Sequence, residues 1–192
     1  MRLRLLTTVV LLAVAVVAAA CGDDDSSNFE PPKDVVTSKT VTQPQPAQAE
    51  APKAKKATPT AGEADIDTKP KVPKGKGSPP SNLVVQDLIV GKGKRADANS
   101  LVSVQYVGVL FDNGKEFDAS WTGKRRGRAF EFALGAGQVI PGWDQGVVGM
   151  RVGGRRKLII PPELAYGAQG FPPDIPPNST LIFDVDVEKV SG

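Results

Sequence analysis

Short segments in the second half of the chain alternate apolar and polar side chains. In one of them Val102, Val104 and Tyr106 alternate with Ser103 and Gln105. Alternation with a period of two predicts a strand with one buried face, and β-branched runs ended by Gly or Pro predict strands as well. The segments expected to form strands are 83–90, 101–111, 115–117, 130–134, 155–160 and 181–188.

A different spacing appears at 141–150, where Trp143, Val147 and Met150 recur on one face of a helix that begins at Pro141. Proline suits the first turn of a helix, and this spacing of apolar residues predicts a helix over 141–150. Three glycines in the segment weaken it in isolation, so packing against the rest of the fold must hold it in place.

The order of these elements predicts an α+β fold of 83–192. Asp112-Asn113-Gly114 favours a tight hairpin, which makes the strands on either side of it antiparallel. Five or six strands with one short helix predict a bent antiparallel sheet that wraps around the helix. Ten of the eleven aromatic residues lie in this part of the chain, which is long enough to bury one core.

Residues 21–82 have a different composition. Ten of the 17 prolines fall between 22 and 82, together with many Ala, Lys, Thr and Gln, and Phe29 is the one aromatic residue. Such a stretch buries too little apolar surface to offset the entropy of the chain, and proline keeps it extended. We expect a disordered linker that acts as a spacer; the alternative is a contact between its lysines and cell-wall polymers.

The first twenty residues have the order of a secretory signal peptide. Arg2 and Arg4 precede an apolar run at 5–20, which ends in Ala18-Ala19-Ala20 directly before Cys21. The arrangement resembles the bacterial lipoprotein signal, although Ala18 stands where that signal usually has Leu. The resemblance implies lipidation of Cys21 and a protein anchored outside the cytoplasm to a bacterial membrane. The alternative is an ordinary signal-peptidase site, which would leave Cys21 as a free thiol.

Composition excludes several classes of function. The chain has no histidine and a single cysteine, which removes Ser-His-Asp catalysis, histidine-dependent metal sites and an intramolecular disulfide. We therefore expect no metal and no cofactor. Residues 83–192 carry thirteen basic and twelve acidic side chains, so a nearly neutral domain gives no electrostatic reason to expect nucleic-acid binding.

Six short motifs occur in an order that resembles the FKBP-type peptidyl-prolyl cis–trans isomerases. The resemblance covers about 84–190. The motifs are Tyr106-Val-Gly108, Gly114-Lys-Glu-Phe-Asp118, Phe130-Glu-Phe-Ala-Leu-Gly135, Val139-Ile-Pro-Gly-Trp143, Ala165-Tyr-Gly167 and Ile175-Pro-Pro-Asn-Ser-Thr-Leu-Ile-Phe-Asp184.

The resemblance implies an apolar pocket between sheet and helix that receives a proline ring. Residues expected to act on the bound imide are Tyr106, Phe117, Asp118, Trp143, Tyr166 and Phe183; those expected to bind substrate are Phe130, Val139, Ile140 and Ile175. Trp143 would form the floor, while the Tyr166 hydroxyl and the Ile140 N–H would donate hydrogen bonds to substrate carbonyls. Asp118 either polarises or orients the bound imide, or anchors the Tyr106 hydroxyl or a neighbouring arginine.

Two surface features lie outside these motifs. Segment 121–128 is basic, which would favour acidic substrate segments, although a solvated loop is the simpler interpretation. Phe171 lies in a loop that overhangs the pocket in relatives, so it is expected to add a substrate contact.

The function implied is therefore a monomeric, membrane-anchored isomerase that accelerates X–Pro rotation in exported, proline-containing polypeptides, with macrolides such as FK506 or rapamycin as possible ligands. One alternative is a non-catalytic, FKBP-like module that binds proline or acts as a chaperone. Another is a surface adhesin or scaffold in which the linker is the active part.

Overall fold

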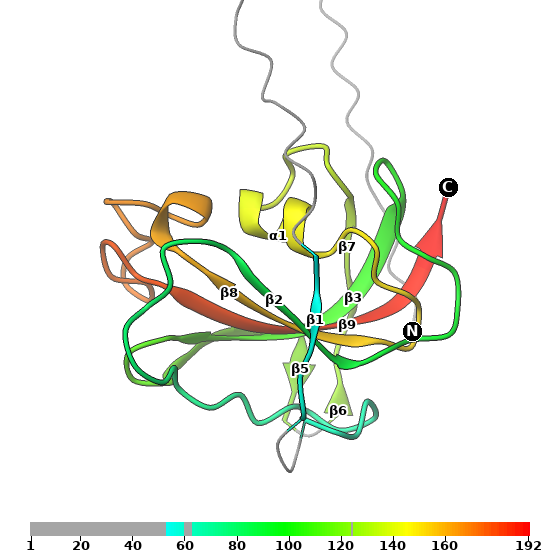
Figure 1. The fold of residues 1–192 in the computed structure, drawn as a ribbon, viewed down its shortest axis with the longest axis horizontal. Coiled ribbons are helices and arrows are strands. Elements are labelled where there is room, and N and C mark those ends of the chain that lie inside the picture. The colour runs from blue at the N-terminus through cyan, green and yellow to red at the C-terminus, as the bar shows by residue number, and fades with distance from the viewer. Residues whose placement is uncertain (1–52, 60–62, 124) are drawn as a thin grey trace, which may run out of the picture. The chain divides into compact units, whose positions relative to one another are not determined.

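The computed structural model of the chain describes residues 53–59, 63–123 and 125–192. Its main feature is a seven-stranded sheet (Figure 1). The strand order is β1 (Lys55–Lys56), β2 (Val84–Ile89), β8 (Arg155–Ile160), β9 (Leu181–Ser191), β3 (Leu101–Leu110) and β4 (Glu116–Ala119), and β7 (Phe130–Ala133) also pairs with β3. A separate two-stranded hairpin contains β5 (Trp121–Thr122) and β6 (Arg125–Arg126).

The predicted α+β class and the single short helix are confirmed. All strand pairs of the large sheet are antiparallel except β1 with β2, which is parallel and was not expected. The helix α1 (Pro141–Gly146) is shorter than predicted, because the chain turns at Gly149, whose φ is 84°. A 3₁₀ turn, η1 (Pro162–Leu164), follows β8.

Packing against the sheet holds the glycine-rich helix, as its sequence required. A Cβ atom at Gly142 would lie 2.4 Å from the Ile160 side chain, and one at Gly146 would lie 2.6 Å from Leu158. Both distances are too short for real atoms, so the two glycines allow α1 to approach β8 more closely than any larger residue would. Trp143, Val147 and Met150 are buried in this contact.

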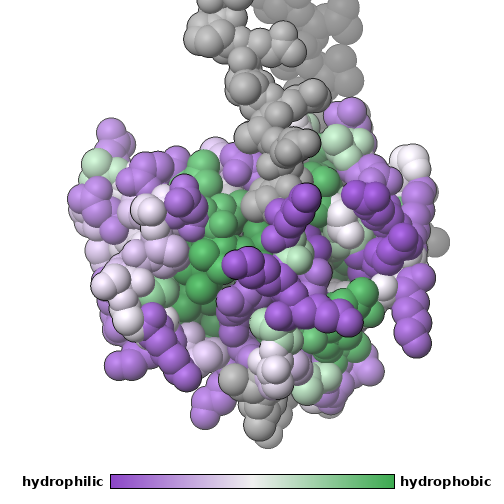
Figure 2. Space-filling model, in the orientation of Figure 1, coloured by the Kyte–Doolittle hydropathy of each residue, from purple (hydrophilic) through white to green (hydrophobic). Residues whose placement is uncertain are grey.

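Hydrophobic residues are buried on both faces of the sheet. The larger cluster lies beneath α1 and includes residues of β3, β7, β8 and β9. The cluster on the opposite face consists of Val72, Val107, Val109, Phe111, Trp121 and Ile182. On the face seen in Figure 2, apolar groups reach the surface left of centre, over β2 and β8, and hydrophilic side chains flank them.

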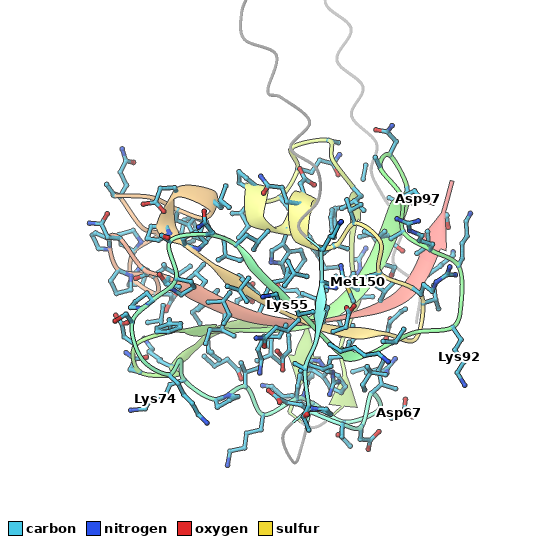
Figure 3. The ribbon with its side chains drawn as sticks, in the orientation of Figure 1. Lys55, Asp67, Lys74, Lys92, Asp97 and Met150 are labelled. Carbon is cyan, nitrogen blue, oxygen red and sulfur yellow. The ribbon has the colours of Figure 1, made fainter. Side chains whose placement is uncertain are left out.

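The folded part of the chain begins earlier than residue 83, where the sequence placed it. Residues 63–80, here called the strap, run along the side of the sheet away from α1 (Figure 1), and Figure 3 shows Asp67 and Lys74 on that side. Val72 is 9% exposed, and the Gly75 N–H donates to the Phe111 carbonyl at 2.8 Å. The expectation of a coreless linker over 21–82 is therefore wrong for the strap.

A single arginine side chain of β8 explains why the strap can pack with so few apolar residues. The Arg155 guanidinium donates to the carbonyl oxygens of Glu63, Asp65 and Thr68 at 3.0–3.1 Å, and to that of Ile66 at 3.5 Å. Backbone carbonyls are present whatever the side chains are, so the composition of the strap gave no sign of this attachment.

Residues 1–52, with the predicted signal peptide and Cys21, lie outside the described residues. Among the described residues, no helix has the length and apolar character needed to cross a bilayer.

Candidate active site

A pocket of about 480 Å³ opens on the α1 side of the sheet. Strands β3, β4, β7 and β9, the start of α1 and the loop after η1 each contribute side chains to it. The lining residues are Tyr106, Phe117, Asp118, Phe130, Gly137, Gln138, Val139, Ile140, Trp143, Tyr166 and Phe183. Nine of the ten pocket residues named from the sequence are therefore brought together in one cavity.

Aromatic rings meet edge to face around Trp143. The ring centroids of Tyr106 and Phe183 lie 5.2 and 5.3 Å from that of Trp143, with interplanar angles of 82° and 87°. Phe130 lies 6.1 Å from it at 81°. Such contacts fix the orientation of each ring, because the positive ring edge is attracted to the negative ring face. Trp143, which is 4% exposed, lies at the start of α1 and at the centre of these rings.

The wall formed by Phe117 and Phe183 depends on a glycine in β3. A Cβ atom at Gly108 would lie 2.7 Å from both the Phe117 and the Phe183 ring. The absence of a side chain lets these rings approach the strand and meet each other at 5.4 Å and 88°. Gly108 therefore determines how close the Phe117 and Phe183 rings lie to β3, and with it the width of the cavity.

The one carboxylate of the pocket is hydrogen-bonded to an aromatic residue. The Tyr106 hydroxyl donates to Asp118 Oδ2 at 2.6 Å. Burial, and then the hydrogen bond and charge of Asp118, raise the pKa of Tyr106, so its hydroxyl stays protonated. Of the two interpretations of Asp118, the geometry supports the anchor for Tyr106. Within the described part of the chain, no arginine pairs with Asp118.

Tyr166 stands at the rim with its hydroxyl available. The side chain is 37% exposed, and its hydroxyl makes no hydrogen bond among the described residues. Burial and the nearby Asp118 charge raise the pKa of Tyr166, so the hydroxyl remains a donor at neutral pH. Phe171, which is 61% exposed, packs against the Tyr166 ring at 5.6 Å and extends the apolar rim.

A second donor belongs to Ile140, which lines the pocket directly before α1. The Ile140 carbonyl accepts the N–H groups of Trp143 at 2.9 Å and Asp144 at 3.3 Å. The Ile140 N–H itself has no hydrogen-bond partner in the parts of the chain that the structure describes. Two residues that line one cavity, Tyr166 and Ile140, thus each carry a donor without a partner among the described residues.

Ile175 differs from its expected place. The side chain is 3% exposed, belongs to the core and does not line the pocket. Its backbone instead closes the loop 171–175 at the rim of the pocket, here called the rim loop. The Phe171 N–H donates to the Ile175 carbonyl at 2.8 Å, and the Ile175 N–H donates to the Phe171 carbonyl at 2.9 Å.

Gly137 and Gln138 also line the pocket, although the sequence did not predict them there. Asp144 accepts the N–H groups of Gly135 and Gly137 at 2.8 and 3.0 Å, which holds their turn against the helix. Gln138 Oε1 accepts the Ala133 N–H at 2.9 Å. Their position directly before Val139 was the available signal.

Comparison with known proteins agrees with this geometry. Residues 92–188 match the family model of the FKBP-type peptidyl-prolyl cis-trans isomerases. An FK506-binding protein of Streptomyces anulatus is 54% identical over 123 residues, which are 64% of this chain and 97% of that protein. The peptidyl-prolyl cis-trans isomerase FKBP53 of Arabidopsis thaliana is 53% identical over 113 residues, which are 58% of this chain and 23% of that protein.

Solved structures show the same fold. The crystal structure of FkpA from Escherichia coli is similar with a TM-score of 0.51 and 43% identity, over 66% of this chain and 53% of that one. The crystal structure of AtFKBP13 gives a TM-score of 0.51 and 42% identity, over 57% of this chain and 94% of that one. A family model that covers half of the chain, together with an aromatic pocket formed by the expected residues, identifies this chain as a member of the FKBP-type peptidyl-prolyl cis–trans isomerase family.

Proposed function

We propose that the aromatic pocket receives the proline ring of exported polypeptides and accelerates rotation about the X–Pro bond by favouring a twisted amide. The observation that carries this proposal is the pairing of an open, ring-lined cavity with two free hydrogen-bond donors, the Tyr166 hydroxyl and the Ile140 N–H.

The reaction needs no bond to be cleaved. Partial double-bond character of the C–N bond gives a barrier of about 18–20 kcal/mol, and uncatalysed X–Pro exchange takes tens to hundreds of seconds. The twisted amide has lost resonance, so its carbonyl oxygen carries less negative charge than in the planar form. An apolar cavity solvates the polar planar form less well than water does, which narrows the gap to the twisted form.

The pocket residues have two roles in this reaction. Trp143 and the rings around it hold the proline while the preceding carbonyl swings. The Tyr166 and Ile140 donors hold substrate carbonyls, which keeps the backbone on either side in one orientation. Acceleration of about 10⁴-fold needs ~5.5 kcal/mol of differential binding, which is a reasonable sum for one aromatic pocket with two donors.

The proposed cellular setting follows from the first twenty-one residues. A cationic start, an apolar run and three alanines before Cys21 support export and lipidation, so the domain would act outside the cytoplasm on newly exported chains. The Cys21→Ser variant should then move from the membrane fraction to the soluble fraction. Membrane retention of this variant would contradict the lipid anchor while leaving the isomerase unaffected.

Turnover is tested with the full chain and an Ala-Leu-Pro-Phe peptide, by NMR exchange between the cis and trans signals. Trp143→Leu should lower kcat/KM by at least about tenfold, equivalent to ~1.4 kcal/mol of transition-state stabilisation. Trp121→Leu is the matched control, because Trp121 is buried in the cluster on the other face of the sheet. Peptide binding without faster exchange would contradict catalysis and favour the binding module.

Ligand binding gives an independent test. The relative from Streptomyces anulatus is named for FK506, which supports this macrolide as a ligand of the pocket here. FK506 should change the tryptophan emission of the chain and compete with the peptide, and the Trp143→Leu variant should lose the emission change.

We also propose that the protein is a monomer in solution, which sedimentation tests.

A further inference from the structure

We propose that a recess next to the proline pocket is a second substrate subsite, which selects polypeptides with an acidic side chain near the proline. The proposal rests on the proposed function, because it concerns residues that flank the proline in the same substrate. The recess has a volume of about 650 Å³ and is lined by Tyr106, Ser120, Arg128, Ala129, Phe130 and Glu131.

The recess adjoins the proline pocket. Tyr106 and Phe130 line both cavities, and their rings meet edge to face at 6.2 Å. Phe130 is 41% exposed, so its ring forms a low divide between the two hollows instead of a closed wall. An extended peptide whose proline lies over Trp143 therefore has room to place a neighbouring side chain beyond Phe130.

Polar contacts through the buried Gln105 hold the segments that line the recess in place. Gln105, which is 1% exposed, donates through Nε2 to the Gly127 carbonyl at 3.0 Å. The Tyr106 N–H donates to Ser120 Oγ at 2.8 Å, and the Ser120 hydroxyl donates to Gln105 Oε1. A Cβ atom at Gly127 would lie 2.0 Å from the Ser120 carbonyl oxygen. The backbone at Gly127 is therefore in direct contact with the backbone at Ser120. The backbone that carries Arg128 is thus fixed in relation to Tyr106.

Arg128 is the cation available to a ligand in the recess. Its guanidinium makes no hydrogen bond or ion pair with any described residue. Arg126, two positions earlier, instead donates to Glu188 at 2.6 Å and to the Ile66 carbonyl at 2.6 Å. A planar guanidinium can bind a carboxylate through two parallel hydrogen bonds, which favours Asp or Glu at this place in the substrate.

The charges that line the recess agree with this preference. Arg128 is the basic lining residue, and the sequence between Ser120 and Ala129 contains no acidic residue. Glu131 is the opposing charge on the lining, and it is exposed. Its carboxylate should reduce the preference for acidic substrates without reversing it, so its removal should strengthen that preference.

The test compares peptides that differ in one side chain. Ala-Leu-Pro-Phe is extended by Glu, Gln or Lys on its N-terminal or its C-terminal side, and kcat/KM is measured by NMR exchange with the full chain. At one of the two positions, Glu should exceed Gln by about threefold, as expected for a partly exposed ion pair. The ratio should fall toward one in 0.5 M salt, because salt screens exposed charges.

Variants assign the effect to Arg128. In Arg128→Gln the Glu-to-Gln ratio should fall to one, in Arg128→Lys it should partly remain, and in Glu131→Gln it should rise. Lys92→Gln is the control of equal charge change, since Lys92 is exposed and points away from the sheet in Figure 3; it should keep the wild-type ratio. A ratio of one in the wild type at both positions, or an unchanged ratio in Arg128→Gln, would overturn the subsite. Failure to isomerise even the Gln peptide would instead overturn the proposed isomerase reaction.

Discussion

Arg155 and Asp186 form a doubly hydrogen-bonded ion pair between neighbouring strands, with Nε to Oδ1 at 2.6 Å and the second guanidinium nitrogen to Oδ2 at 2.7 Å. The side chains are 0% and 1% exposed. Burial raises the pKa of the Asp186 carboxyl, against the opposing effect of the guanidinium. The remaining Arg155 donors bind the strap, so one side chain joins β8, β9 and a segment almost ninety residues earlier in the chain.

Replacing Arg155 should therefore destabilise the fold strongly. Arg155→Met leaves the Asp186 carboxylate buried without its cation and frees the carbonyls of the strap, which should lower the free energy of unfolding by about 3–5 kcal/mol. Urea titration measures the loss. Arg95→Met is the control, since Arg95 forms an exposed pair with Asp97 and should change stability by less than ~1 kcal/mol. An equally small effect of Arg155→Met would contradict the role assigned to it.

Truncation tests the strap itself. A chain that begins at residue 83 loses the burial of Val72 and four acceptors of Arg155, which should cost at least about 3 kcal/mol of stability relative to a chain that begins at residue 53. The comparison is made by urea titration of both chains. Equal midpoints of urea unfolding would show that the strap contacts the sheet without stabilising the fold.

Most of the fold could be predicted because its strands carry local signals. Alternation at 101–107 and β-branched residues at 83–90 predicted strands that the structure confirms. The strap had no such signal, because its attachment uses backbone carbonyls and the side chain of Arg155. The alternation of β9 was also misleading, since Asp184 and Asp186 are 0% and 1% exposed and face the strap instead of solvent.

The site was predictable where a family motif and a cavity coincide. Tyr106, Trp143 and Phe183 fall in one cavity, as the resemblance implied. Ile175 does not, because its side chain packs into the core while its backbone holds Phe171. Motif order indicates which residues are near a site, whereas the direction of each side chain depends on packing that sequence spacing does not encode.

Asp184 should make the stability of the protein depend on pH. Burial raises the pKa of its carboxyl to about 7, and Glu63 and Asp186 add to this effect while Lys157 and Arg155 oppose it. Neither carboxylate oxygen has a hydrogen-bond partner among the described residues, and the Lys157 ammonium is 3.8 Å away. The folded state thus keeps a proton that the unfolded chain has released, so the free energy of unfolding should fall as pH rises from about 4 to 7.

Asp184→Asn should remove this contribution. The difference in unfolding free energy between wild type and variant should change across that window by at most ~1.4 kcal/mol per pH unit, with no further change above pH 8. Asp174→Asn is the control, because Asp174 is exposed in the rim loop. Identical pH curves for wild type and Asp184→Asn would show that Asp184 titrates normally.

Gly108→Ala should damage the pocket more than the fold. The new methyl group would meet the Phe117 and Phe183 rings and push them into the cavity, so we expect kcat/KM to fall about tenfold, with a stability loss of ~1–3 kcal/mol from overpacking. Val109→Ala, on the opposite face, should lose stability while it keeps kcat/KM. Unchanged turnover in Gly108→Ala would show that the wall can move back without cost.

Tyr106→Phe and Asp118→Ala together distinguish the two roles of the pocket carboxylate. If Asp118 acts by anchoring the Tyr106 hydroxyl, each single variant removes the same 2.6 Å hydrogen bond. Each should then lower kcat/KM by about three- to tenfold, equivalent to the ~0.7–1.4 kcal/mol expected for a solvent-exposed hydrogen bond, and the double variant should be no worse than the more impaired single variant. Peptide exchange measured by NMR gives all four rates of this cycle. If the double variant instead loses the product of the two single fold-reductions in kcat/KM, Asp118 acts on the imide independently of Tyr106. The geometry supports that role less.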